Sequence, residues 1–190
     1  MAQAIETHKV NGYTVKIYQD EDAESTMTID ATNDAREQAK AQLEGMREML
    51  ARLKHAINCD ASEPDECELC KDENEPDTQL EIEITRQYTF DELHDEDSAR
   101  DAIREDALEV QVRSGWTNPS ETLEPAEFNI LLCTGGPAVR IMGELDNYGN
   151  PERAWLEYKD WGTPWVELIE SDTMDKRNAL LEYASHYLGY

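Results

Sequence analysis

The chain has 190 residues, with 43 Asp and Glu against 17 Lys and Arg, which gives a formal net charge of −26 at pH 7. This length suffices for one ordinary domain, or for a compact domain with an appended module. The charge repels nucleic acid and anionic membranes, so we expect neither direct binding of DNA or RNA nor a membrane partner. Basic protein surfaces and cations are the partners that such a charge favours.

The compartment is indicated by two further features of the sequence. No run of 18 apolar residues is present, and residues 1–9 lack the basic and apolar parts of a signal peptide. We therefore expect a cytoplasmic protein. In a reducing compartment, four cysteines favour a metal site or simple packing over a disulfide framework.

The N-terminal part of the chain begins with a hairpin signal. The pair Asn11-Gly12 precedes alternating apolar residues in 13–18, which predicts a short β-hairpin. The acidic residues that follow are typical of a loop, with a brief strand expected around Met27 and Ile29.

A long amphipathic helix is predicted over residues 34–58, where apolar residues recur at alternating spacings of four and three. Asp34 with Glu37 resembles a capping box with Asp in place of Ser or Thr. The stripe favours packing in the core over an intermolecular coiled coil, because three heptads are near the minimum for the latter. Its members are Ala39, Leu43, Met46, Leu50, Leu53 and Ile57.

The middle of the chain changes character three times. Residues 60–78 contain Pro and almost no aliphatic residues, so they are predicted to be a connection without a core of its own. Alternation of apolar and acidic residues over 80–88 predicts a half-buried strand with an acidic outer face. A helix is predicted over 91–108, with Ser98 as its candidate cap. A strand is then expected at Leu108, Val110 and Val112.

Beyond Gly115 the composition becomes richer in aromatic residues and Gly. Strands are predicted over 128–133, 138–145 and 154–158, and a three-stranded antiparallel meander is the simplest arrangement for them. A final helix starting at Asp172 is predicted to cover one face of that sheet. It carries Leu180, Leu181, Ala184, Tyr187 and Leu188.

Together these elements predict an α+β fold: a small antiparallel sheet packed by helices, with one long amphipathic helix and an acidic insertion that zinc could order. We divide the chain into an acidic N-terminal region, 1–106, and an aromatic-rich C-terminal sheet and helix, 107–190.

Four potential zinc ligands lie within sixteen residues: His55, Cys59, Cys67 and Cys70. His55 and Cys59 are four apart at the end of the predicted helix and lie off its apolar stripe, and the other two cysteines have the spacing of a zinc knuckle. The pattern predicts a structural zinc site, because four protein ligands leave no open position for catalysis. Exposed thiols without a metal and a redox pair are the alternatives.

Acidic residues are concentrated between 60 and 106, where 19 Asp and Glu face four Lys and Arg. Outward carboxylates on a strand are about 7 Å apart, a spacing comparable with that of phosphates along one nucleic-acid strand. Mimicry of nucleic acid and a plain solvated acidic surface are both compatible with this pattern. Calcium binding is a further alternative, although no EF-hand loop is present. The candidate partner-binding residues are Asp65, Glu66, Glu68, Asp72, Glu73, Glu75, Glu81, Glu83, Asp91, Glu92, Asp95, Glu96 and Asp97.

Two further motifs are better explained by structure than by chemistry. The run Cys133-Thr134-Gly135-Gly136-Pro137 could form a phosphate nest, but it lacks the Lys and Ser of a P-loop, so a turn in the sheet is favoured. The aromatic residues of 155–165 could form a binding surface, yet irregular spacing around Gly and Pro is more typical of core and turn packing.

A resemblance covers residues 107–170. It is carried by the run 127–141 (EFNILLCTGGPAVRI), then Gly143-Glu144-Leu145, Ala154-Trp155-Leu156 and Asp160-Trp161-Gly162-Thr163-Pro164-Trp165, with Arg113-Ser114-Gly115-Trp116 upstream. This stretch resembles a family of uncharacterised proteins common in bacteriophages and prophages. The resemblance implies a phage origin and no particular mechanism. In size and charge alone, the chain is also similar to acidic phage inhibitors of restriction and CRISPR systems.

We therefore expect a non-enzymatic phage inhibitor that blocks the Lys/Arg groove of a host nucleic-acid-binding complex, such as a CRISPR surveillance complex, by acting as an acidic nucleic-acid mimic. The alternative is a phage adaptor or regulatory protein that binds through its aromatic C-terminal region, the acidity serving solubility. A metal-dependent enzyme is a third class, but no motif selects a ligand set for it.

Overall fold

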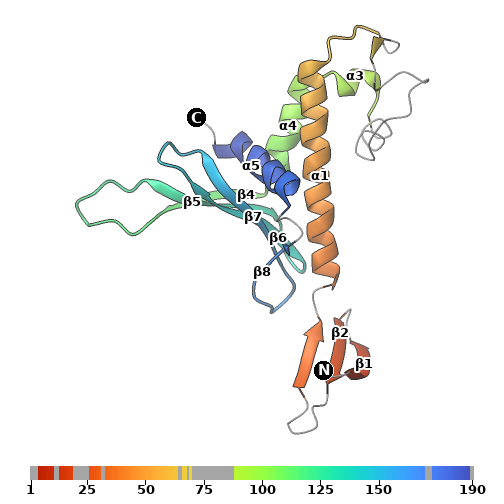
Figure 1. Cartoon of the computed structure of the whole chain (residues 1–190), viewed down its shortest axis with the longest axis vertical. Coiled ribbons are helices and arrows are strands. Elements are labelled where there is room, and N and C mark those ends of the chain that lie inside the picture. The colour runs from red at the N-terminus through yellow and green to blue at the C-terminus, as the bar shows by residue number, and fades with distance from the viewer. Residues whose placement is uncertain are drawn as a thin grey trace.

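The computed structural model describes residues 4–10, 13–18, 26–30, 33–63, 66–67, 69, 88–169 and 173–188, with backbone alone up to residue 33. It contains helices, a five-stranded antiparallel sheet and a separate three-stranded sheet (Figure 1). The predicted α+β class with a small antiparallel sheet packed by helices is confirmed.

The three-stranded sheet is formed by β1 (Ala4–Val10), β2 (Tyr13–Tyr18) and β3 (Thr26–Asp30), in that order. Both neighbouring pairs are antiparallel, and Val10 lies opposite Tyr13 across the first connection. The predicted hairpin and the brief strand that follows it are both confirmed. In Figure 1 this sheet lies beyond the N-terminal end of the long helix.

The long helix α1 spans Asn33–Asn58, close to the predicted 34–58. Its predicted stripe is buried from Ala39 to Leu53, and Ala35 extends the stripe by one turn. Ile57 was predicted to belong to the stripe but is 50% exposed, because α1 extends past the sheet and its last turn meets other partners. The sequence also gave no reason to expect Arg52 in the interior, where it is 5% exposed.

The five-stranded sheet is a meander whose strands follow one another in chain order. Its strands are β4 (Glu109–Ser114), β5 (Pro125–Cys133), β6 (Ala138–Leu145), β7 (Pro151–Lys159) and β8 (Val166–Glu167). The three strands of the predicted meander are its centre. The strand expected at Leu108, Val110 and Val112 is confirmed as β4, which forms one edge, and β8 forms the other. A strand as short as β8 has no recognisable alternation, so the sequence did not predict it.

Helices α1 and α5 (Met174–Leu188) cover one face of this sheet (Figure 1). Side chains on that face, such as Phe128, Ile141 and Leu156, are fully buried, and Leu180 and Ala184 of α5 pack into the same core. The predicted role of the final helix is confirmed. Polar and half-buried residues alternate with the core residues and line the opposite face of the sheet.

The region before the sheet contains two helices where one was predicted over 91–108. Helix α3 spans Phe90–Leu93 and α4 spans Glu96–Asp106, with a break at His94 and Asp95. Asp95, not the predicted Ser98, is the cap of α4: its carboxylate accepts a hydrogen bond from the Ser98 N–H at 2.9 Å. Thr89 is the N-cap of α3 and Asp95 is the N-cap of α4. Because the second cap follows so soon after the first, the first helix ends before the second begins.

Helix α4 is fixed to the core by its apolar and its polar contacts. Ala99 and Ile103 are buried against the core, and the Tyr183 hydroxyl of α5 donates to Asp106 at 2.5 Å. Burial and the hydrogen bond to Asp106 raise the pKa of Tyr183, which keeps its proton at any physiological pH. The predicted boundary at 106/107 falls between α4 and β4, and the hydrophobic core includes residues from both sides of it.

Every helix within the described ranges is too short or too polar to cross a membrane. The strand predicted over 80–88 lies outside the described residues except for Tyr88.

Candidate metal centre

Four side chains from three segments converge beyond the sheet, at the C-terminal end of α1. They are His55 in the last turns of α1, Cys59 directly after it, Cys67, and His94 at the end of α3. One ligand atom from each residue lies within 4.8 Å of every other. Two thiols and two imidazoles at this separation form a group that could hold a metal ion.

The closest distances within the group match those of a tetrahedral centre. Nε2 of His55 is 3.5 Å from Sγ of Cys67, and Nε2 of His94 is 3.2 Å from Sγ of Cys59. A tetrahedral ion with metal–sulfur bonds of about 2.3 Å and metal–nitrogen bonds of about 2.0 Å separates neighbouring ligand atoms by roughly 3.3–3.8 Å. Little movement of these side chains would therefore be needed to enclose an ion.

The orientation of His94 is set by its other ring nitrogen. Nδ1 lies 2.8 Å from the backbone carbonyl oxygen of Phe90, which can only accept a hydrogen bond, so Nδ1 carries the proton. Nε2 is then left with a lone pair that points toward Cys59. A backbone carbonyl that fixes the tautomer in this way is a common partner of metal-binding histidines.

The surroundings of the cluster also disfavour the protonated, charged form of His55 and the thiolate form of Cys59. Burial, with the nearby His94 ring as a smaller cause, lowers the pKa of His55. Burial raises the pKa of the Cys59 thiol, and Cys67 adds to the effect. A bound cation would reverse this preference at the thiols, because it stabilises the thiolate form.

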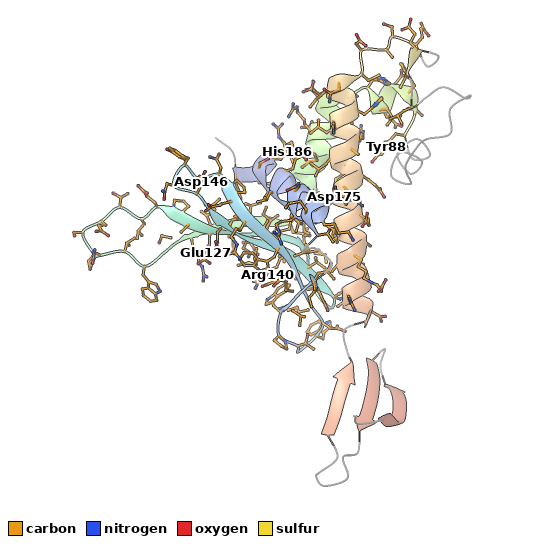
Figure 2. All side chains as sticks on the ribbon, in the orientation of Figure 1. Tyr88, Glu127, Arg140, Asp146, Asp175 and His186 are labelled. Carbon is orange, nitrogen blue, oxygen red and sulfur yellow. The ribbon has the colours of Figure 1, made fainter. Side chains whose placement is uncertain are left out.

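Arg52, one turn before His55, attaches α3 to α1 independently of the four ligands. Its guanidinium donates from Nε and Nη2 to the Glu92 carbonyl oxygen at 3.1 and 2.9 Å, and from Nη2 to the Ser98 hydroxyl at 3.0 Å. It also lies 4.4 Å from the ring centroid of Tyr88, which is beside α1 in Figure 2. The cluster and Arg52 therefore join the same two segments.

Three of the four predicted metal ligands, His55, Cys59 and Cys67, are brought together. The fourth, Cys70, lies outside the described residues. In the described group the fourth position belongs to His94, which the sequence analysis did not assign. The capping box at Thr89 and Glu92 marks the start of the helix that carries this histidine, but no sequence signal places His94 beside the cysteines.

Seven predicted partner-binding acids lie outside the described residues: Asp65, Glu68, Asp72, Glu73, Glu75, Glu81 and Glu83. The other six are all exposed: Glu66, Asp91, Glu92, Asp95, Glu96 and Asp97.

Several of the exposed acids have local structural roles. The Glu92 carboxylate accepts from the Thr89 N–H at 2.8 Å, which lowers its pKa, and Asp95 caps α4. Glu96 pairs with Arg100 at 2.7 Å, and Glu66 accepts from the Ser62 N–H at 3.0 Å. Part of the acidity in this region is therefore used to start helices and turns, and a partner would meet it already hydrogen-bonded.

The Gly-Gly-Pro run at 133–137 and the aromatic residues of 155–165 belong to the strands of the five-stranded sheet and their connections. Residues 134–137 form the connection between β5 and β6, and a Cβ at Gly136 would overlap the ring of Trp161, so the two motifs pack on each other. The ring centroid of Trp165 lies 4.1 Å from the guanidinium carbon of Arg140 and 4.7 Å from Nζ of Lys159. Turn packing is therefore the role of Gly136, as expected.

No family model, curated protein or solved structure matches this chain. The assignment of a function therefore depends on the geometry of the Cys/His cluster and on the surfaces around it.

Proposed function

We propose that the chain is a non-enzymatic binding protein in which a structural zinc ion fixes an acidic surface, and that this surface occupies the basic groove of a nucleic-acid-binding complex. The proposal includes the expectation that the complex belongs to a bacterial defence system. The observation that carries it is the Cys/His cluster, because its four ligand atoms join α1 to the start of the acidic α3–α4 region.

Zinc is the ion that this ligand set favours. Two thiolates and two imidazoles suit Zn²⁺ better than Mg²⁺ or Ca²⁺, which prefer oxygen ligands. Four protein ligands fill a tetrahedral coordination sphere and leave no position for water or substrate. A structural role follows, and the ion would hold α3 at the end of α1.

The zinc assignment is tested by elemental analysis of purified protein. We expect about one zinc per chain, and less than about a tenth of that in Cys67→Ser and His94→Gln. Matched controls are Cys133→Ser and His186→Gln, which change the same residue types outside the cluster and should retain the metal. Zinc-free protein, or equal loss in the controls, would contradict the assignment.

The acidic surface that the proposed ion holds on α3 continues onto α4, which the hydrophobic core holds directly. Asp97, Asp101 and Glu105 are spaced by four residues and are all exposed, so they form a stripe about 6 Å apart along the helix. Ala99 and Ile103 on the other side of α4 are buried, which fixes the direction of the stripe. The rigidity of this array supports recognition of a Lys/Arg groove, because a preordered surface loses little entropy on binding.

The partner is sought by affinity capture from bacterial lysate at low and at high salt, followed by mass spectrometry. We expect one nucleic-acid-binding complex that is released as ionic strength rises. The triple variant Asp97→Asn, Asp101→Asn, Glu105→Gln should lose this complex. A control that neutralises Glu124, Glu152 and Glu167, which are equally exposed, has the same net charge and should retain it. Equal loss in both variants would show that binding depends on net charge and not on the position of the acids on α4.

A second candidate is an adaptor that binds through the aromatic residues of the C-terminal half. Trp116 is fully exposed and Trp161 is 71% exposed, which is uncommon for side chains of this size. Trp116→Ala would abolish capture of an adaptor's partner, whereas the acidic mimic would tolerate it.

A further inference from the structure

Among the described residues, no strand pairs with the outer side of the edge strand β4. In the described part of the chain it pairs with β5 alone, and five of its six residues are exposed. Residues 109–113 pair with β5 in continuous register, before a shift between Arg113 and Ser114, and the strand contains no Pro. The outer N–H and C=O groups of this stretch form a template for another strand.

The sequence of β4 is complementary to itself. Residues 109–113 read Glu-Val-Gln-Val-Arg, with opposite charges at the ends, valines at the second and fourth positions and an amide in the centre. In an antiparallel pair of two copies centred on Gln111, each Glu109 lies opposite an Arg113 and each Val110 opposite a Val112. Gln111 meets its own copy on the two-fold axis. Opposite charges and β-branched pairs directly across two strands are the favourable cross-strand combinations.

We propose that two copies of this chain dimerise through β4, joining their five-stranded sheets edge to edge around a two-fold axis. Both charged residues, Glu109 and Arg113, are exposed, and Glu109 accepts one hydrogen bond from Gln111 on its own strand at 2.9 Å, which leaves further acceptor capacity. The Arg113 side chain is 72% exposed and forms an ion pair with Glu127 of the same sheet. This pair leaves other guanidinium N–H groups free to donate to a second carboxylate. Both are on the face of the sheet that the helices do not cover.

The helix side of β4 supplies the apolar part of the contact. Val110 and Val112 are 39% and 49% exposed, although the residues opposite them on β5, Ile130 and Phe128, are fully buried. The helices therefore do not cover this edge, and Val110 and Val112 form an exposed apolar strip beside the core, called the ledge below. Leu108, 60% exposed, extends it. Self-pairing would cover this ledge with the same residues of the second copy.

A second copy fits this edge better than an unrelated strand, because the self-pairing register satisfies both charges at once. The two chains repel each other through their net charges of −26 each, so the dimer should be weak at low ionic strength and tighten as salt screens this repulsion. This salt dependence is opposite to that expected for an acidic surface in a basic groove.

The test is sedimentation equilibrium of the full chain from micromolar to millimolar concentration. We expect a reversible dimer, weakened about tenfold or more by Val112→Lys, which puts a charge on the ledge. The matched control is Val166→Lys on β8, a valine of similar exposure (40%) at the other edge of the sheet, which should leave the dissociation constant unchanged. A chain that stays monomeric, or a dimer that tolerates Val112→Lys, overturns the proposal.

A charge exchange tests the register without touching the apolar residues. Glu109→Arg and Arg113→Glu should each weaken self-association about threefold or more, because each variant places like charges opposite one another. An equal mixture of the two restores opposite charges at both positions and should form a heterodimer. Absence of a heterodimer, with both variants folded by circular dichroism, would overturn the proposed register.

Discussion

The two halves of α1 are held by different physical means. From Ala35 to Leu53 the helix buries an apolar stripe against the sheet, α4 and α5. From Arg52 to the residue after its end it is also held by polar groups: the Arg52 guanidinium, the His55 imidazole and the Cys59 thiol. Apolar burial scales with area and tolerates small shifts, but hydrogen bonds and metal ligands depend on distance and angle. The first half therefore supports the whole fold, and the second positions one local segment.

The largest effect is expected in the apolar half. Leu43→Ala removes a fully buried side chain between α1 and the sheet, and we expect a loss of about 2–5 kcal/mol in the free energy of unfolding. Ile57→Ala, at the exposed end of the same helix, should cost far less. Urea denaturation of both variants measures this difference, and equal losses would contradict the division of the helix.

The Cys/His cluster should have a strong but local effect. Cys67→Ser, or removal of the proposed zinc ion by a chelator, is expected to abolish protection of the Leu93 and His94 amides, which bond to Thr89 and Phe90, against hydrogen exchange while amides of β5–β7 stay protected. Simultaneous loss of protection in the central strands would mean that the cluster supports the entire fold.

An intermediate effect is expected at Arg52. Arg52→Met keeps much of the apolar stem but leaves the Glu92 carbonyl and the Ser98 hydroxyl without this donor, at a cost of about 1–3 kcal/mol. Arg52→Lys should recover only part of the loss, because an ammonium group cannot reproduce the planar fork. Full recovery with Lys would show that charge alone matters at this position.

The smallest expected effect concerns His186 on α5. Burial lowers its pKa, and Arg100 and Arg104 on α4 lower it further, against the opposite influence of Glu182. A lowered pKa in the folded state means that the contribution to stability is complete above the unfolded value near 6.5 and is lost as pH falls below it. His186→Gln should therefore lose less stability than the parent chain between about pH 7.5 and about pH 5.5, measured by urea denaturation at both values. An identical pH dependence would contradict this assignment.

Periodicity predicted the parts of the fold where burial is regular. The stripe of α1 follows from a helical spacing, and β5 from a continuous apolar run. The predicted bounds of α1, β5, β6 and β7 agree with the structure to within three residues. The break between α3 and α4 was missed because the caps at Thr89 and Asp95 were not weighed against the helical pattern of 91–108.

Only the ligands of the Cys/His cluster that are close together in the sequence were predictable. His55, Cys59 and Cys67 are close in sequence, so their spacing pointed to a common site. His94 is 27 residues beyond Cys67 and joins the cluster through tertiary folding, which spacing does not encode. The burial of Arg52 was missed for the same reason, since its partners Glu92 and Ser98 are 40 and 46 residues away.

The order of the elements also has a consequence for synthesis on the ribosome. Helix α1 ends at Asn58, but the partners of its apolar stripe include α5, which is complete only at Leu188. At about 5–20 residues per second, the ribosome needs roughly 6–26 s to add the intervening 130 residues. During that interval a nascent chain displays Leu43, Met46 and Leu50 without their final cover. During synthesis, α1 is therefore the segment most accessible to chaperones and proteases, before the five-stranded sheet has formed.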